Sequence, residues 1–322
     1  MGHTTKAIII VAVILLAIGL IIAGIAFALG GYSLRALDKP SSFEEKTYNY
    51  DAKKVSSIDV SDVSRDVKVI GWDKDEIKII SYESKEEYYK VDLTRDGTLT
   101  VKYINKTKWF FNLNVGFGYD DMDTLTVYIP SKLHQAKADF NGDINVSTVS
   151  GNIEIDGINR EKSTLLATTS GDIELSSITS NGNMSLTSIS GNIDFERVNI
   201  VGDFRSSTTS GDLEIDSCDI SGSFGFSAIS GEVDLHRVSI GGDVSFNTTS
   251  GNIDFERLAC ENFRAESIGG DISGTIIGDP GDYRSAADSI SGDINVPNYS
   301  DGKKLIDVNT TSGNINISLI KN

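Results

Sequence analysis

A short phrase recurs at a fixed interval between Asn141 and Ile317, and it reads serine, glycine, then a polar, an apolar, an acidic and an apolar residue. Its glycine stands at positions 20 residues apart: Gly151, Gly171, Gly191, Gly211, Gly231 and Gly251. The phrase returns with small slips in spacing at Gly270, Gly292 and Gly313. A period of this length predicts a solenoid, because one such unit cannot bury its apolar face without a stacked neighbour.

Side chains inside each repeat alternate between apolar and polar, which indicates half-buried strands. The apolar positions form three columns, two, four and seven residues after each glycine. The first column is Ile153, Ile173, Ile193, Leu213, Val233 and Ile253; the second is Ile155, Leu175, Phe195, Ile215, Leu235 and Phe255; the third is Ile158, Ile178, Val198, Cys218, Val238 and Leu258. A weaker glycine phrase nine residues earlier, as at Gly142 and Gly182, predicts a second strand in each unit.

We therefore predict an all-β fold, a parallel β-helix of about 20 residues per rung. The crossover rule favours a right-handed coil. Nine rungs at ~4.8 Å each give a rod of roughly 40 Å. We expect the glycines to form corners that other residues would strain, and the Asn or Asp after each one to bond its own backbone.

Acidic residues are concentrated in the repeats. The formal net charge is −17; residues 1–140 hold 18 basic and 19 acidic residues, whereas residues 141–322 hold 11 and 27. This balance excludes nucleic acid as a partner, since that needs a basic surface. It suits repulsion between rods or a cationic partner.

An outward acidic column is the candidate cation-binding or partner-binding face. It comprises Glu154, Glu174, Asp194, Glu214, Asp234 and Asp254. Stacked like charges are unfavourable, and Arg197, Arg237 and Arg257, three residues after an acid, are expected to relieve part of the repulsion. The alternative is a solvated face with no ligand. The calcium-binding nonapeptide of other β-helices is absent.

Catalytic chemistry is not predicted. The sequence lacks nucleophile and phosphate-loop motifs, and its Cys and His residues have no zinc spacing, so no catalytic residue, metal or cofactor is assigned. The only cysteines, Cys218 and Cys260, fall in inward columns two rungs apart. That separation of ~10 Å is too long for a disulfide, and we expect buried free thiols.

The N-terminal part predicts a membrane anchor. A polar head, residues 1–6, is expected in the cytoplasm. It precedes an uncharged apolar run of 23 residues, Ala7 to Leu29, which is long enough to span a bilayer as a signal anchor. A cleaved secretory signal is the alternative, because Ala26-Phe27-Ala28 resembles a cleavage site. Residues 30–46 form a linker. The solenoid is then expected on the extracellular side of the cell membrane.

Residues 47–140 alternate in β fashion without a strict period and are expected to cap the solenoid, either as a sandwich-like domain or as irregular first rungs. This region contains an aromatic stretch with Trp109, Phe110, Phe111, Phe117 and Tyr119. These side chains either plug the end of the tube or form a contact loop for a membrane surface or a partner.

The repeats with their Thr-Thr-Ser or Ser-Ile-Ser lead-in, together with the upstream Leu-Thr-Val-Tyr-Ile-Pro from Leu125 to Pro130, resemble the putative-adhesin family of bacterial β-strand-repeat proteins. The resemblance covers roughly Val55 to Ile317. It implies a β-solenoid at the cell surface and a non-enzymatic role, and it supplies no catalytic residues. Some members of this domain of unknown function resemble Gram-positive envelope-stress proteins.

The sequence thus predicts a single-pass cell-surface β-solenoid with a role in adhesion or in binding during envelope stress. Possible partners are cationic peptides, cell-wall polymers or another envelope protein. The alternatives are a carbohydrate-active β-helix enzyme, which would need carboxylates converging in a groove, and a passive structural spacer.

Overall fold

The computed structural model describes residues 43–106, 124–160, 162–297 and 300–321. Among these residues, no helix combines the length and the hydropathy that a membrane crossing requires. The predicted span from Ala7 to Leu29 lies outside the described residues. Contacts group residues 44–322 into one unit, and everything below concerns that unit.

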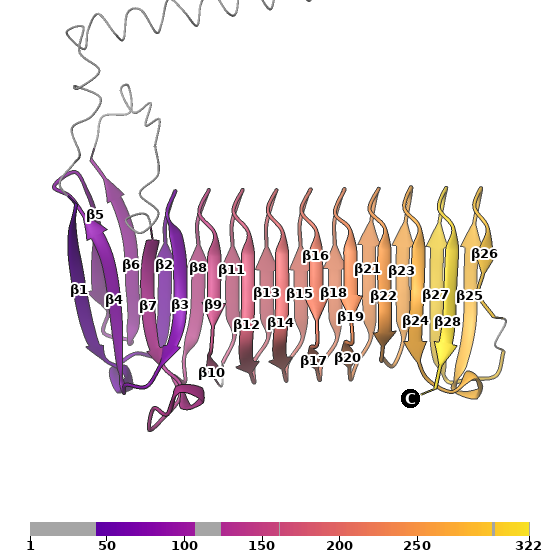
Figure 1. The fold of residues 1–322 in the computed structure, drawn as a ribbon, viewed down its shortest axis with the longest axis horizontal. Coiled ribbons are helices and arrows are strands. Elements are labelled where there is room, and N and C mark those ends of the chain that lie inside the picture. Colours follow the sequence, from indigo (N-terminus) through magenta and orange to yellow (C-terminus); the bar gives the residue numbers. More distant parts are fainter. Residues whose placement is uncertain (1–42, 107–123, 161, 298–299, 322) are drawn as a thin grey trace, which may run out of the picture. The chain divides into compact units, whose positions relative to one another are not determined.

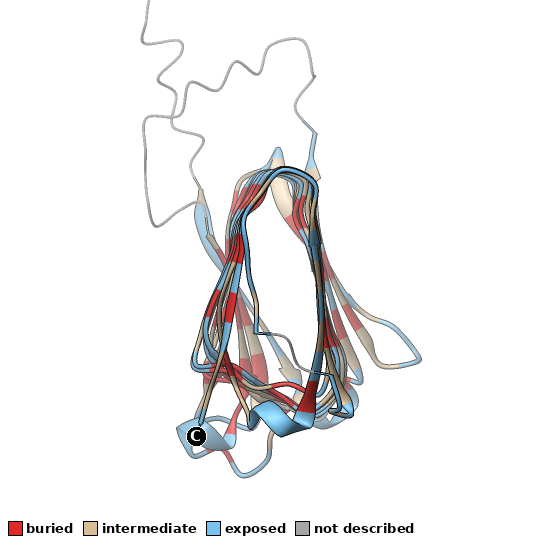
Figure 2. Ribbon diagram, turned by 90° about the vertical axis from the view of Figure 1, so that its right-hand side faces the viewer, coloured by how far each residue is buried: buried red, intermediate tan, exposed pale blue. Residues whose placement is uncertain are grey.

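Two long sheets form the walls of a narrow tube (Figures 1 and 2). The first wall contains β9 (Ile153–Asp156), β12 (Ile173–Ser180), β14 (Ile193–Ile200), β16 (Leu213–Asp216), β19 (Val233–His236), β22 (Ile253–Leu258) and β24 (Ile272–Ile277). The second contains β8 (Asp143–Ser147), β11 (Thr164–Ala167), β13 (Met184–Thr187), β15 (Phe204–Ser207), β18 (Phe224–Ser227), β21 (Val244–Thr248) and β23 (Phe263–Ser267). Short strands β10 (Asn159–Arg160), β17 (Asp219–Ile220) and β20 (Ser239–Ile240) line the narrow base. The prediction of an all-β solenoid is confirmed.

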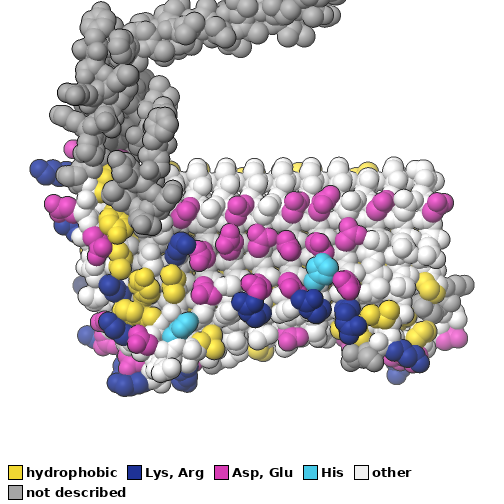
Figure 3. Space-filling view, in the orientation of Figure 1, with side chains coloured by type: hydrophobic (Ala, Val, Ile, Leu, Met, Phe, Trp, Pro, Cys, Tyr) yellow, Lys and Arg dark blue, Asp and Glu magenta, His cyan; other side chains and the backbone are white. Residues whose placement is uncertain are grey.

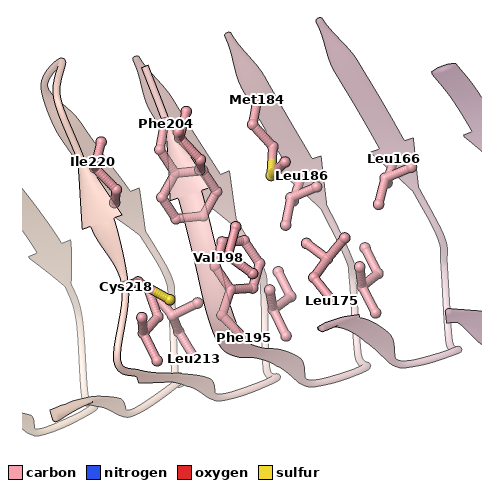
Figure 4. Packing of buried hydrophobic residues seen from close by; sticks show 14 of the residues in the cluster. Leu166, Leu175, Met184, Leu186, Phe195, Val198, Phe204, Leu213, Cys218 and Ile220 are labelled. Atoms are coloured by element: carbon pink, nitrogen blue, oxygen red, sulfur yellow. The ribbon is translucent and has the colours of Figure 1, made fainter. Parts of the chain in front are cut away.

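Strands of successive rungs pair in parallel with their side chains in register. Ile173 lies opposite Ile193, and Leu213 lies opposite Val233, each pair 20 residues apart. All members of the three predicted apolar columns are buried, with exposed fractions of 4% or less. Figure 4 shows members of these columns, among them Leu175, Phe195 and Leu213, packed between the two walls. The period of the sequence therefore encodes the contacts of the core.

Aromatic rings form a continuous stack inside the tube. Phe204 lies 4.8 Å from Phe195 and 4.7 Å from Phe224, measured between ring centroids, and Phe246 and Phe263 extend the series. Such pairs add to the free energy of burial alone. Cys218 and Cys260 are buried and free as predicted. Burial raises the pKa of each thiol to about 12, so both stay protonated near neutral pH.

The repeat glycines are needed for a reason other than the predicted one. None of them has a positive φ; the left-handed corner residues are instead Gly157, Ser177, Arg197, Ser217, Arg237 and Arg257. A Cβ on Gly171 would approach the carbonyl oxygen of Gly151 more closely than the 3.0 Å that real Cβ atoms keep. At every other repeat glycine, a Cβ would be equally close to a carbonyl oxygen of the adjacent rung. Glycine therefore permits the close stacking of backbones, not a turn conformation.

The side chains of the Asn and Asp residues that follow these glycines accept hydrogen bonds from the next rung. The prediction that they bond their own backbone is therefore wrong. The Asn152 side chain accepts a hydrogen bond from the Asp172 backbone N–H at 2.9 Å, and Asp172 accepts one from Asn192 at 2.8 Å. The same bond recurs with Asn192, Asp212, Asn252, Asp271 and Asn314 as acceptors, at 2.6–3.0 Å. These bonds satisfy turn N–H groups that the sheets leave unpaired.

A column of inward hydroxyls lies three residues before the glycines. Thr148, Thr168, Ser188, Thr208, Thr248, Ser267, Ser289 and Thr310 each accept a hydrogen bond from the glycine backbone N–H, at 2.8–3.2 Å. The corresponding residue before Gly231 is Ala228, which has no hydroxyl. This column explains the Thr or Ser that opens the lead-in to every repeat phrase except that of Gly231.

We expect Ala228→Thr to stabilise the protein by about 1 kcal/mol, because its hydroxyl would supply the acceptor that Gly231 lacks. The midpoint of urea unfolding measures the effect. Ala228→Val is the matched control, since it adds a side chain of the same shape without the hydroxyl. Equal midpoints for the Thr and Val variants would show that packing, and not the hydrogen bond, matters at this position.

The N-terminal region continues the same tube. The rung formed by β2 (Ser57–Ser61) and β3 (Asp66–Trp72) pairs in parallel with β8 and β9. The next rung outward is formed by β6 (Thr98–Asn105) and β7 (Thr124–Pro130), which come later in the sequence. Antiparallel strands β1 (Glu44–Asp51), β4 (Glu76–Glu83) and β5 (Glu87–Leu93) finish this end. Short 3₁₀ turns occupy Ala52–Lys54, Lys132–His134 and Pro280–Asp282.

The last rungs at the opposite end are stacked out of sequence order. The chain passes from β24 to an outermost rung, β25 (Tyr283–Ser289) and β26 (Ile294–Asn295), before it returns to an inner rung, β27 (Lys304–Thr310) and β28 (Ile315–Ile320). The stacking order of the glycines is therefore Gly270, Gly313 and Gly292. The last strand in the sequence, β28, is therefore an inner strand, and the earlier strand β26 lies outside it.

Candidate functional site

The acidic column predicted from the repeats lies on the outer face of the first wall. Parallel pairing sets Glu154 beside Glu174, Glu174 beside Asp194, and Asp194 beside Glu214. Asp234 and Asp254 continue the line in the next two rungs. Figure 3 shows Asp and Glu side chains in rows along this face. Six carboxylates are thus aligned at the rung spacing of ~4.8 Å.

Asp194 shows the electrostatic consequence of this stacking. The pKa of Asp194 is raised to about 6. Burial is the largest cause, and the neighbouring carboxylates of Glu214 and Glu174 are the next largest. Like charges at adjacent rungs disfavour the ionised form, as does the partial loss of solvent. The centre of the acidic column therefore has a strong negative potential that a cation would relieve.

Asp194→Asn is expected to stabilise the protein by about 1 kcal/mol at pH 7.5, after allowance for solvent screening of a partly exposed group. The folded protein binds the proton of the Asp194 carboxyl group more tightly than the unfolded chain does. Wild-type stability therefore falls as pH rises from about 4 to about 6. The variant should lose that part of the pH dependence. Urea unfolding at pH 4 and pH 7.5 tests this; an unchanged difference between the two pH values would contradict it.

A second outward column lies beside the first, two residues further along each strand, and contains Asp156, Glu196, Asp216 and Glu256. The acids of both columns around Asp194 line a shallow depression of about 370 Å³. Ser176 and His236 complete the second column. His236 contacts both columns, with Nε2 at 3.4 Å from Asp234 and Nδ1 at 3.2 Å from Glu256.

The arginines do not relieve the first column as predicted. Arg197 pairs with Glu196, and Arg237 pairs with Asp216, so both bind the second column. Each of these arginines directly follows a second-column position in the sequence, and its backbone is left-handed there. Lys68 instead ends the column, with its Nζ at 2.5 Å from Glu154.

The described residues contain no group of three or more His, Cys, Asp or Glu side chains arranged to hold a metal ion. The carboxylates are spread along a line, and each faces solvent on one side. A linear array of this kind suits an extended cationic ligand better than one small ion, because several charges can then be met in sequence. The aromatic residues Trp109, Phe110, Phe111, Phe117 and Tyr119 lie outside the described residues.

An exposed ridge of β-branched residues was not predicted. It follows the turn between the walls, two residues before each repeat glycine or, in the first rung, before Arg65. It includes Val63, Val149, Ile189, Ile229, Ile268 and Ile290, each 45–80% exposed. Thr169, Thr209, Thr249 and Thr311 alternate with the isoleucines in the stacked order. The middle residue of each lead-in, Thr or Ile, is the signal in the sequence that could have revealed this ridge.

A family model described as Toastrack DUF4097 matches residues 55–318. Among solved structures, a putative lipid binding protein from Parabacteroides distasonis is 18% identical, with 85% of this chain and 97% of that chain covered and a TM-score of 0.46. A putative adhesin from Bacteroides fragilis is 14% identical over 85% and 97%, with a TM-score of 0.40. A putative cell adhesion protein from Clostridium sporogenes is 12% identical over 86% and 100%, with a TM-score of 0.29. No curated protein matches the chain.

Proposed function

The chain belongs to the Toastrack DUF4097 family, and on that premise we propose that its solenoid is a non-enzymatic binding domain for cationic polymers or peptides at the cell envelope. The proposal rests on the uninterrupted acidic column from Glu154 to Asp254. Adhesion and envelope-stress binding are both roles in which such a surface would act.

The fold itself does not need acids in this column. At the C-terminal rungs, Ser273, Asn316 and Asn295 occupy the same position, and the strands there pair in the same way. Stacked carboxylates lower stability, whereas neutral residues at this position do not. The acids of the middle rungs therefore carry an electrostatic cost that neutral residues would avoid, which supports a role in binding.

We also propose a membrane location for the domain. The apolar run from Ala7 to Leu29 is long enough to anchor the chain as a single span, and the coil that follows would be right-handed and extracellular. Protease treatment of intact cells tests the location. Digestion of the solenoid without lysis is expected, and full protection in intact cells would contradict the proposed orientation.

Titration of the full chain with a fluorescent decalysine peptide tests the binding function. The triple variant Glu174→Gln, Asp194→Asn, Glu214→Gln should bind roughly tenfold more weakly at low salt, because three adjacent charges are lost from the centre of the column. Raising the salt to 0.5 M should weaken wild-type binding, since the charges are exposed and screened.

A matched control removes the same charge elsewhere. Asp59→Asn, Asp219→Asn, Glu266→Gln alters three exposed acids outside the acidic column and should change the affinity less than twofold. Equal losses for both triples would show that only net charge matters. No binding by the wild-type chain would favour the passive spacer over a binding domain.

A further inference from the structure

Among the described residues, His236 is the only histidine on the acidic face, by which we mean the two outward acidic columns of the first wall. Its place in the second column is taken by Asp216 in the preceding rung and by Glu256 in the following rung. Its Nε2 lies 3.4 Å from a carboxylate oxygen of Asp234, and its Nδ1 lies 3.2 Å from one of Glu256. The imidazole therefore connects the first column to the second.

The protonation state of this ring decides whether both contacts are favourable. A neutral imidazole has one N–H donor and one lone pair, whereas the protonated ring donates from both nitrogens. Ionised carboxylates only accept hydrogen bonds. A neutral ring can therefore donate to one of the two carboxylates, and it turns its lone pair toward the other. Only the protonated ring satisfies Asp234 and Glu256 together.

The surroundings of His236 are acidic on every side. The charged groups that face it are Asp216 and Glu214 on β16, Glu256 and Asp254 on β22, and Asp234 and Arg237 on its own segment of the chain. Arg237 forms an ion pair with Asp216. A positive charge on His236 is thus placed where it neutralises carboxylates of both columns at the same time.

We propose that His236 is a pH-dependent internal cation of the acidic face, which competes with cationic peptides at low pH and releases the face to them as pH rises. The proposal rests on the proposed binding function and concerns the regulation of that surface. Histidine changes its charge in the range between pH 5 and pH 8. When the ring of His236 loses its proton, one of its two carboxylate contacts is lost and the face becomes more negative by one charge.

Asp194 acts in the same direction from two rungs away, since β16 separates its strand β14 from β19. The pKa of Asp194 is raised to about 6, so this carboxyl group ionises between pH 5.5 and pH 7.5. The acids that face it are Glu174 on β12, Glu214 and Asp216 on β16, Glu196 on its own strand, and Asp172 and Asp212 in the adjacent turns. The centre of the acidic face therefore gains two negative charges over this interval, one from His236 and one from Asp194.

Binding of a cation and loss of these protons are linked. A positively charged ligand favours the deprotonated forms of both groups, so its affinity increases with pH and its binding releases protons. Lys68 and the arginines stay charged throughout this range. With roughly a twofold effect for each charge at low salt, the affinity for a cationic peptide should rise about fivefold from pH 5.5 to pH 7.5.

Titration of the full chain with decalysine that carries a pH-insensitive rhodamine label tests the proposal at these two pH values. The variant His236→Gln has a neutral amide at both. It should bind about twofold more tightly than wild type at pH 5.5 and equally at pH 7.5, so that its pH effect falls to about twofold. His134→Gln is the matched control, because His134 is exposed in the turn Lys132–His134 outside the acidic face, and it should keep the fivefold effect.

A permanent charge at the same position separates charge from shape. His236→Lys should bind about twofold more weakly than His236→Gln at pH 7.5, because the lysine stays protonated there. Equal affinities of these two variants at pH 7.5, a pH-independent wild type, or an unchanged pH effect in His236→Gln would each overturn the proposal. Absence of decalysine binding by wild type at both pH values is a different result, which would refute the binding function itself and this regulation with it.

Discussion

Gly211→Ala is expected to destabilise the solenoid by ~3 kcal/mol or more, although it adds only one methyl group. The new Cβ would overlap the carbonyl oxygen of Gly191 in the rung below. The overlapping atom belongs to the backbone of Gly191 and the new Cβ is fixed to the backbone of residue 211, so no side-chain rotation can relieve the overlap. The two rungs would have to separate, which would stretch the hydrogen bonds of both walls. The midpoint of urea unfolding measures the loss.

Gly225→Ala is the matched control, since it makes the same chemical change one rung away. No atom lies within 4 Å of the position that its Cβ would take. Replacing a strand glycine there reduces the entropy of the unfolded chain and is expected to stabilise by about 0.5 kcal/mol. A loss below about 1 kcal/mol for Gly211→Ala, or equal losses for both variants, would contradict the close-stacking explanation.

The core could be predicted from the sequence because its contacts repeat with the period of the chain. Once residues 20 apart are known to stack, the burial of Ile153 or Phe195 follows from strand alternation alone. The roles of the glycines and the Asn or Asp residues could not be inferred in the same way. Their partners lie one rung away, and a local pattern does not distinguish a bond to the next rung from a bond within the turn.

The sequence contains a signal for the order of the last rungs, but this signal can be recognised only once the structure is known. From Asn152 onward the turn ladder alternates Asn with an acidic residue, apart from Asp212 and Glu232, which are both acidic but still occupy successive rungs. From Val149 onward the ridge alternates Thr with Val or Ile. In sequence order both alternations fail near the C-terminus, but in the stacked order they continue as Asp271, Asn314, Asp293 and as Ile268, Thr311, Ile290. The slips in spacing at Gly292 and Gly313 therefore mark an exchange of rung order and not a local insertion.

The acidic face was predicted correctly in position but not in its ion pairs. Position follows from the alternation of a strand, which places Glu174 and Asp194 outward on one wall. Pairing depends on the corner after the strand, where Arg237 has a φ of 53°. A left-handed arginine is uncommon, and nothing in the local sequence signals it, so counting three residues along an ideal strand gave the wrong partner.

A buried arginine connects the regular rungs to the N-terminal end of the tube. Arg65 lies in the turn between β2 and β3 and is 4% exposed. Its Nη1 donates to the Tyr82 carbonyl at 2.5 Å, and its Nη2 lies 3.6 Å from Glu87. The guanidinium also lies 5.4 Å from the ring centroid of Tyr103. One side chain thus contacts β4, β5 and β6.

Arg65→Ala is expected to cost about 3–5 kcal/mol, because it leaves Glu87 and the Tyr82 carbonyl without this partner in a largely buried site. The loss should be local. Amide hydrogen exchange should accelerate in β4, β5 and β6, while the rungs from β11 to β22 keep their protection, since repeat proteins lose structure from their ends. Arg95→Ala, at an exposed turn position, is the control and should change stability by less than about 0.5 kcal/mol. If hydrogen exchange accelerated equally along the whole tube, the end strands and the solenoid would unfold as one unit. Arg65 would then not stabilise the N-terminal strands separately.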